Sequence, residues 1–201
     1  MKPETILRHE VAWRSWKVET QNDELRLRSV VAPEIWEPKK QMEASCSHYS
    51  TWNMKSVPRR KACRCEEREE DEIPNLRGQC GIYALPTLQA AAYPDLRSQF
   101  LYGRIVGKVK VWGTLWEGDT GLRAEFAYPA TLECGVCEIC SQIFPIEELW
   151  LVLRGERRAR EFPDSSYTLQ CRKHLMPYAL LAHPPGWHGK LLETYALQQA
   201  A

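Results

Sequence analysis

The chain has 201 residues, a formal charge of +1 at pH 7 and 44% hydrophobic residues. A chain of this length can bury one sizeable core or two small ones, and its near-neutral charge argues against a general nucleic-acid coat. No apolar run approaches the roughly 20 residues that span a bilayer, and the first nine residues lack the apolar stretch of a signal peptide. We therefore expect a cytoplasmic protein, whose eight cysteines favour metal binding over disulfides.

Two stretches alternate apolar and polar residues with the period of a β-strand. Residues 9–31 contain two such runs, separated by the polar turn Gln21-Asn22-Asp23. Residues 104–128 contain the clearest hairpin, with its turn at 117–121. Gly103, Gly107 and Gly113 in or beside its first strand indicate bulges or strong bending. The pattern predicts a small, bent antiparallel β domain.

An irregular, cysteine-bearing segment, residues 41–80, lies between these hairpins. Its acidic run, residues 66–78, is too polar to bury much apolar surface, so we expect a surface insertion. A second zinc site in this segment would explain how so polar a stretch is ordered, and the sequence leaves its existence open. Its default ligands are Cys46, Cys63, Cys65 and Cys80, with His48 as the substitute for one of them.

The strongest motif runs from Cys134 to His174. A Cys-x-x-Cys turn aims two sulfurs at one point, and a second pair farther along the chain completes a tetrahedron, which is the ligand arrangement of structural Zn²⁺. The preferred ligands are Cys137, Cys140, Cys171 and His174. Cys134 is the alternative, because an all-thiolate set of the four cysteines is also conceivable. Four protein ligands leave no position for a reacting water, so such a site stabilises structure and does not catalyse.

The order of this C-terminal part resembles the treble-clef class of zinc finger: a knuckle, intervening strands and a second ligand pair. Residues 143–153 are apolar enough for a strand or a short helix, and residues 174–181 and 190–200 have helical patterns. Residues 86–92 have the composition of a further short helix. The sequence therefore predicts an α+β protein with a β-rich domain at 1–130 and a zinc finger with a C-terminal helix at 131–201.

A second resemblance begins at Cys80-Gly81-Ile82-Tyr83-Ala84. With the strand Gly107-Lys-Val-Lys-Val-Trp112-Gly113 and the run Leu122-Arg-Ala-Glu-Phe-Ala-Tyr-Pro129, it is similar to a group of uncharacterised bacterial proteins. The resemblance covers about residues 10–130 and implies no activity. In that group a Cys-x-Cys pair runs directly into Gly-Ile-Tyr-Ala, whereas here the acidic insertion separates Cys65 from Cys80.

Three functions are compatible with these features. The preferred one is a non-catalytic, zinc-stabilised adaptor that presents a surface to a protein or nucleoprotein partner. The alternative is a nucleic-acid-binding finger that uses a basic patch at residues 154–173. The third is a metal-dependent nuclease or hydrolase, for which His183 and His188 are candidates, but no phosphate loop, nucleophile elbow or His-Glu-x-x-His helix supports it. The basic patch contains Arg154, Arg157, Arg158, Arg160, Arg172 and Lys173.

Overall fold

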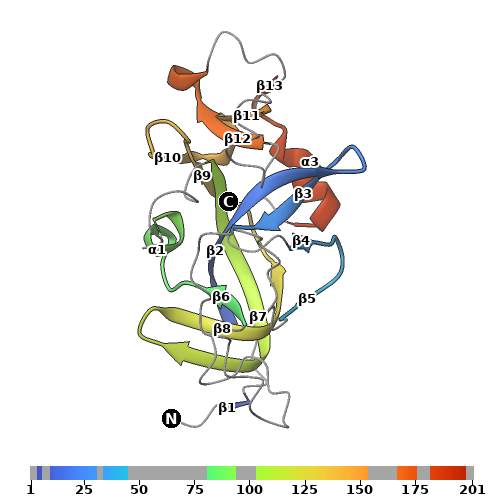
Figure 1. Ribbon diagram of the computed structural model, residues 1–201, viewed down its shortest axis with the longest axis vertical. Coiled ribbons are helices and arrows are strands. Elements are labelled where there is room, and N and C mark those ends of the chain that lie inside the picture. The colour runs from blue at the N-terminus through green and yellow to red at the C-terminus, as the bar shows by residue number, and fades with distance from the viewer. Residues whose placement is uncertain are drawn as a thin grey trace, which may run out of the picture.

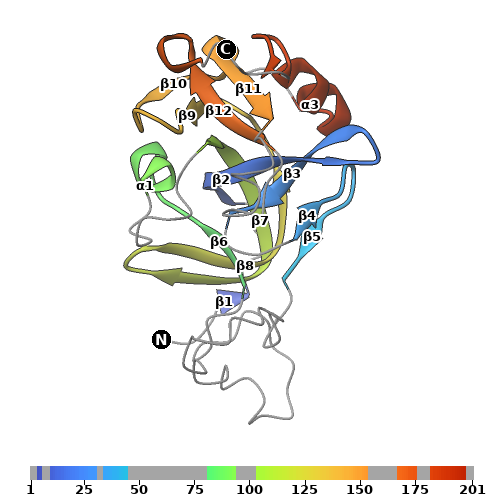
Figure 2. The same ribbon diagram turned by 45° about the horizontal axis from the view of Figure 1, so that its top comes forward.

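The computed structural model describes residues 4–5, 10–30, 34–44, 81–93, 103–153, 167–175 and 182–197. Short antiparallel strands predominate in these residues and the few helices are short, so the fold is of the α+β kind (Figures 1 and 2). None of the helices in the described ranges is long and apolar enough to cross a membrane. The elements are β1 (Glu4–Thr5), β2 (Glu10–Gln21), β3 (Glu24–Ser29), β4 (Ile35–Trp36), β5 (Met42–Glu43), β6 (Ile82–Ala84), α1 (Leu88–Ala92), β7 (Arg104–Gly118), β8 (Gly121–Pro129), β9 (Cys134–Val136), β10 (Ile143–Pro145), the 3-10 turn η2 (Ile146–Glu148), β11 (Leu149–Leu153), β12 (Tyr167–Cys171), the 3-10 turn η3 (Arg172–His174), β13 (Ala182–His183) and α3 (His188–Tyr195).

Strand β7, which has 15 residues, is the central strand of the larger sheet (Figure 1). One of its edges pairs with β2, in a register that sets Trp16 opposite Ile105. Its other edge pairs first with β9 and then with β8, so one strand connects the two ends of the sheet. The sequence prediction of strands at 9–31 and 104–128 is confirmed, because each apolar alternation faces a common core that includes Trp16, Val109 and Val111.

The backbone pairing closes on itself around the predicted bend. Strand β8 pairs with β6, where Ile82 lies opposite Ala124. Leu85, directly after β6, exchanges two backbone hydrogen bonds of 2.8 and 2.7 Å with Trp13 of β2. Pairing therefore runs from β2 through β7, β8 and β6 back to β2. This pairing encloses the interior of the small β domain, while β10 and β4 remain the end strands of the described sheet.

A β-bulge in β7 produces part of this bend. The register against β8 shifts between Trp112 and Leu115, and Gly113 has a φ of +81°, a conformation that glycine adopts at little cost. The N–H of Thr114, freed from the ladder by the bulge, donates to the Glu125 carboxylate at 2.9 Å. Glu125 therefore accepts the hydrogen bond of a backbone N–H that the bulge leaves without a strand partner. The predicted bulge is found at Gly113.

A smaller, three-stranded sheet in the order β12-β11-β13 covers the other end of the molecule together with α3 (Figure 2). Leu149, Leu151 and Leu169 from this sheet belong to the same buried cluster as Trp16 and Leu27 of the larger sheet. Residues on both sides of position 130 thus share one core, and β9 pairs directly with β7. The predicted domain boundary at 130/131 stays a prediction. The segments on its two sides pack against each other in this shared core.

Helix α1 begins with a side-chain cap, and helix α3 ends at a residue in the left-handed conformation. Helix α1 begins after Thr87, whose Oγ1 accepts from the N–H of Ala90 at 3.1 Å. The predicted terminal helix is present but shorter than expected, because Ala196 adopts a left-handed φ of 53° and the N–H of Leu197 returns to the Leu192 carbonyl at 2.8 Å. Residues 143–153, expected to be strand or helix, contain β10, η2 and β11.

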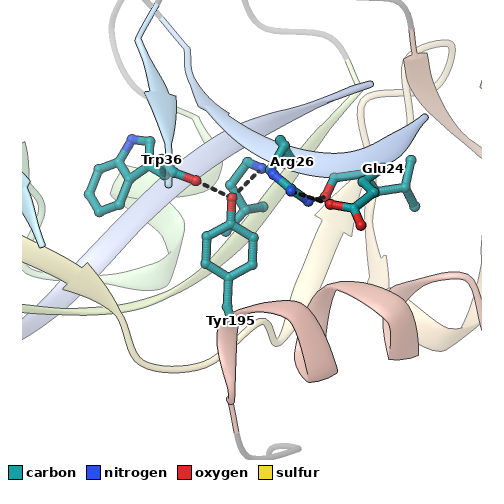
Figure 3. Close-up of polar contacts among 6 residues, drawn as sticks. Glu24, Arg26, Trp36 and Tyr195 are labelled. Carbon is teal, nitrogen blue, oxygen red and sulfur yellow. Dashed lines mark hydrogen bonds and ion pairs between the residues drawn. The ribbon is translucent and has the colours of Figure 1, made fainter. Parts of the chain in front are cut away.

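Helix α3 is attached to the larger sheet through one buried hydroxyl (Figure 3). The Tyr195 hydroxyl accepts from the Leu27 N–H at 2.9 Å and donates to the Trp36 carbonyl. Tyr195 is 1% exposed, and its burial raises the pKa of the phenol to about 12, so the donor proton is kept. The ion pair of Arg26 with Glu24 in the same view is largely exposed on its acidic side and contributes little.

We predict that Gly113→Ala destabilises the fold by about 2–4 kcal/mol, through a left-handed φ and overpacking together. A Cβ at this position would lie 2.7 Å from Glu125 Oε2 and 2.8 Å from Phe126 Cδ2. The matched control is Gly118→Ala in the same strand, where the nearest atom to a new Cβ is 3.8 Å away. Urea unfolding measures both variants, and equal losses of stability would contradict the packing argument.

We predict that Tyr195→Phe lowers the free energy of unfolding by about 2–3 kcal/mol, because the change leaves a buried N–H and a buried carbonyl without a partner. The comparison is Tyr128→Phe, whose part-buried hydroxyl donates to the Tyr195 carbonyl at 3.0 Å and accepts from the Lys39 N–H at 2.8 Å. Water can replace these bonds, so we expect a smaller loss. Thermal unfolding of the two variants distinguishes them, and the reverse order would count against this role of Tyr195.

Candidate metal centre

Four side chains from two distant parts of the chain meet at one point. They are the preferred ligands of the sequence analysis, Cys137, Cys140, Cys171 and His174, and their ligand atoms all lie within 4.8 Å of one another. It is the one group of this kind in the part of the chain that the structure describes. The cluster lies between the β9–β10 hairpin and the smaller sheet.

The first two ligands lie in the turn of the β9–β10 hairpin. Val136 and Ile143 pair at its base, and the N–H of Cys137 donates to the Gln142 carbonyl at 3.0 Å. The N–H of Ser141 donates back to the Cys137 carbonyl at 3.0 Å, with Ser141 in a left-handed φ of 57°. This tight turn is a knuckle: it directs the sulfurs of Cys137 and Cys140 to the same side.

The second two ligands lie where β12 becomes a 3-10 turn. Cys171 is the last residue of β12, opposite Leu149 of β11, and it precedes η3. Residues three apart in a 3-10 helix lie on the same side, which sets His174 above Cys171. His174 Nδ1 lies 3.2 Å from the Cys171 sulfur and 3.7 Å from the Cys137 sulfur.

Backbone contacts hold the two ligand pairs together. The N–H of Glu138, inside the knuckle, donates to the Leu169 carbonyl of β12 at 2.8 Å. Gly135 allows the two segments to approach, because a Cβ there would lie 2.5 Å from Leu149 Cδ1 and 2.7 Å from Leu169 Cδ1. The Tyr93 hydroxyl, at the end of α1, donates to the Ser141 carbonyl at 2.6 Å and supports the turn from outside. Sequence reasoning did not identify Gly135 or Tyr93, since neither carries a ligand atom.

The spacing suits a tetrahedral Zn²⁺. Bonds of about 2.3 Å to sulfur and about 2.05 Å to nitrogen place sulfur and nitrogen ligands about 3.5 Å apart. The two Nδ1–sulfur distances of 3.2 and 3.7 Å lie on either side of this value. Three thiolates and an imidazole are also the donors that Zn²⁺ prefers. The cluster is therefore compatible with zinc in both geometry and chemistry.

The electrostatics of the cluster favour a bound cation. Burial alone would raise the pKa of Cys137, but hydrogen bonds from the N–H groups of Cys140, Cys171 and Ile139 and from His174 lower it to about 7. The pKa of Cys171 is raised, first by burial and then by its hydrogen bond to Cys137 and the negative charge of that thiolate. One thiolate thus makes the next harder to form, and a divalent ion would remove this conflict.

Cys134, the alternative ligand, is not part of the cluster. Its side chain is 6% exposed and packs with Ala91, Ala92 and Val106 in a separate buried group beneath α1. Burial, and secondly the charge of Glu133, raise its pKa to about 11. Cys134 lies two positions before Val136, on the same side of β9, so the strand turns it away from the knuckle.

Several other predicted site residues lie outside the described residues, and their roles stay predictions. They are Cys46, His48, Cys63, Cys65, Cys80, Arg154, Arg157, Arg158 and Arg160. The helical pattern at 174–181 and the insertion at 66–78 fall there too, in whole or in part. The remaining members of the basic patch, Arg172 and Lys173, are exposed on η3 beside the cluster.

The two histidines of the hydrolase interpretation are separate from the metal cluster. His183 of β13 lies with its ring 5.6 Å from that of Tyr167. His188 begins α3 and is 8% exposed, with its ring 6.2 Å from that of Trp187. Burial lowers the pKa of His188, which favours a neutral ring in the core.

We predict that Cys171→Ser lowers zinc affinity by at least about tenfold and destabilises the loaded protein, because metal binding and folding are coupled. Cys134→Ala is the matched control, since it also removes a buried thiol but lies outside the cluster, and it should leave zinc affinity unchanged. Competition with a chromophoric chelator measures both affinities. Zinc loss in the Cys134 variant with retention in the Cys171 variant would exclude this ligand set.

Comparisons of the chain with protein-family models, with curated proteins and with solved structures found no match. The resemblances to a bacterial group and to treble-clef fingers thus stay expectations from the sequence. The interpretation of the site depends on its own ligand geometry and chemistry, and the cluster of three cysteines and one histidine is the feature that carries it.

Proposed function

We propose that Cys137, Cys140, Cys171 and His174 hold one Zn²⁺ in a closed site, in a treble-clef-like arrangement. The knuckle, the β11–β12 hairpin and the ligand pair at η3 follow one another in the order that such fingers have. Four protein ligands occupy the tetrahedral positions, so no position is left for a reacting water. The site would join the knuckle to the smaller sheet and act as a structural element.

We further propose that the protein is a non-catalytic adaptor that binds a protein or nucleoprotein partner beside this site. Two large apolar side chains are exposed at the knuckle: Ile139 at its tip is 44% exposed, and Tyr93 is 40% exposed. Tyr93 contacts the knuckle through Ser141, so both side chains would be fixed by the metal. Rigid, exposed tyrosine and aliphatic side chains are suited to protein docking.

The second zinc site at Cys46, Cys63, Cys65 and Cys80, with His48 as substitute, is a proposal that metal counting tests. The described chain stops at Ala44 and resumes at Gly81. On both sides of this interval it pairs with the same edge of β8, where the N–H of Ala44 donates to the Glu125 carbonyl and Ile82 lies opposite Ala124. Cys46 and Cys80 are each two residues along the chain from those anchored positions. Two zinc ions per chain would support the second site, and one would remove it.

We predict that Ile139→Asp abolishes binding of the partner that co-purifies with the native protein and leaves zinc content unchanged, since Ile139 contributes no ligand atom. A combined Arg157, Arg158 and Arg160→Ala variant should keep that partner. Pull-down with quantitative mass spectrometry, in parallel with binding to single- and double-stranded nucleic acid at two salt concentrations, measures both effects. Salt-sensitive nucleic-acid binding that the arginine variant loses would instead establish the nucleic-acid-binding finger.

A further inference from the structure

The three cysteines of the metal centre differ in their access to solvent. Cys137 is fully buried and Cys171 is 4% exposed. Cys140, near the tip of the knuckle, is only half-buried. A reagent from solvent therefore reaches the sulfur of Cys140 more readily than the other two.

The three sulfurs also differ in their hydrogen bonds. The sulfur of Cys137 accepts a hydrogen bond from the Cys171 N–H at 3.4 Å, and the sulfur of Cys171 lies 3.2 Å from His174 Nδ1. Among the described residues no hydrogen bond to the sulfur of Cys140 is found. An N–H donor withdraws electron density from a thiolate and tunes a metal site from outside the ligand shell. Cys140 lacks this protection.

From these two differences, and resting on the zinc site proposed above, we infer that Cys140 is the modification site of the metal centre, where hydroperoxides and other soft electrophiles attack. In the zinc-loaded protein all three cysteines are thiolates, so their exposure determines which sulfur an oxidant reaches first. The buried Cys134 lies outside the cluster and is protected by its packing against α1. The site thus has one reactive sulfur and two shielded ones.

The chemistry needs hydrogen peroxide as its oxidant. The Cys140 thiolate attacks one peroxide oxygen, the O–O bond breaks, and Cys140 becomes a sulfenic acid as hydroxide leaves. The Cys137 thiolate, in the same turn, then attacks the Cys140 sulfur, forms a disulfide and displaces a second hydroxide. Two electrons pass from the two thiolates to the peroxide, and the two hydroxides take up protons to give water.

The disulfide would leave only Cys171 and His174 as ligands, so the metal would be released. The knuckle would then keep its backbone contact at Glu138 and lose its metal connection to the smaller sheet. Because Ile139 lies on this knuckle and Tyr93 contacts it through Ser141, oxidation would also disorder the proposed docking surface. Peroxide would in this way weaken partner binding.

The test treats the zinc-loaded, full-length protein with substoichiometric hydrogen peroxide and dimedone, a sulfenic-acid trap. Peptide mass spectrometry locates the modified cysteine, and a chromophoric chelator follows zinc release. We expect trapping at Cys140 several-fold ahead of Cys137 and Cys171, and a Cys137–Cys140 disulfide when the trap is left out. Modification that starts at Cys137 or Cys171, or equally at all three, would overturn the inference.

Two variants complete the experiment. Cys140→His keeps four ligand groups, so it should hold zinc and release it several-fold more slowly with peroxide, and wild-type release rates in this variant would overturn the inference. Cys134→Ala removes a thiol outside the cluster and should match the wild type. The zinc content before peroxide is the separate test of the proposed function: a protein without zinc refutes both, whereas a zinc-loaded protein modified elsewhere refutes only this inference.

Discussion

The hydrogen bond from the Glu138 N–H to the Leu169 carbonyl joins the knuckle to β12, and the candidate metal centre depends on it. His174 is 37 residues beyond Cys137, so the two ligand pairs meet only if the segments that carry them lie side by side. The absence of a side chain at Gly135 allows Leu149 and Leu169 to approach the knuckle. Packing and backbone pairing thus set the spacing that the metal chemistry requires.

The rest of the fold makes that junction rigid. Closed pairing through β2, β7, β8 and β6 fixes the larger sheet. Strand β7 also pairs with β9, the strand that leads into the knuckle. The Tyr195 hydroxyl fixes α3 against β3 and β4. The smaller sheet and α3 share one buried cluster with the larger sheet. A substitution far from the cysteines, at Gly113 or Tyr195, therefore alters the same folded unit that positions the metal ligands.

The charges of the cluster explain why a cation would be retained. N–H donors favour a thiolate at Cys137, and the same thiolate opposes ionisation of Cys171. A divalent ion resolves this opposition by compensating several negative charges at once. Cys140 is the most exposed of the three cysteines, and it is the position at which we propose that oxidants react.

The sequence by itself determined the local features: the alternation of the hairpins, a bulge or bend among Gly103, Gly107 and Gly113, the short helix within 86–92 and the four ligand types. Each of these depends on residues near one another in the chain. It left Cys134 and His174 as alternatives. Only the tertiary structure decided between them, since the direction of the Cys134 side chain from β9 depends on which face of that strand packs under α1. The closure of the larger sheet and the contact of Tyr195 with Leu27 could not be predicted from the sequence either. Both join residues that are distant in the chain, and no local pattern specifies such contacts.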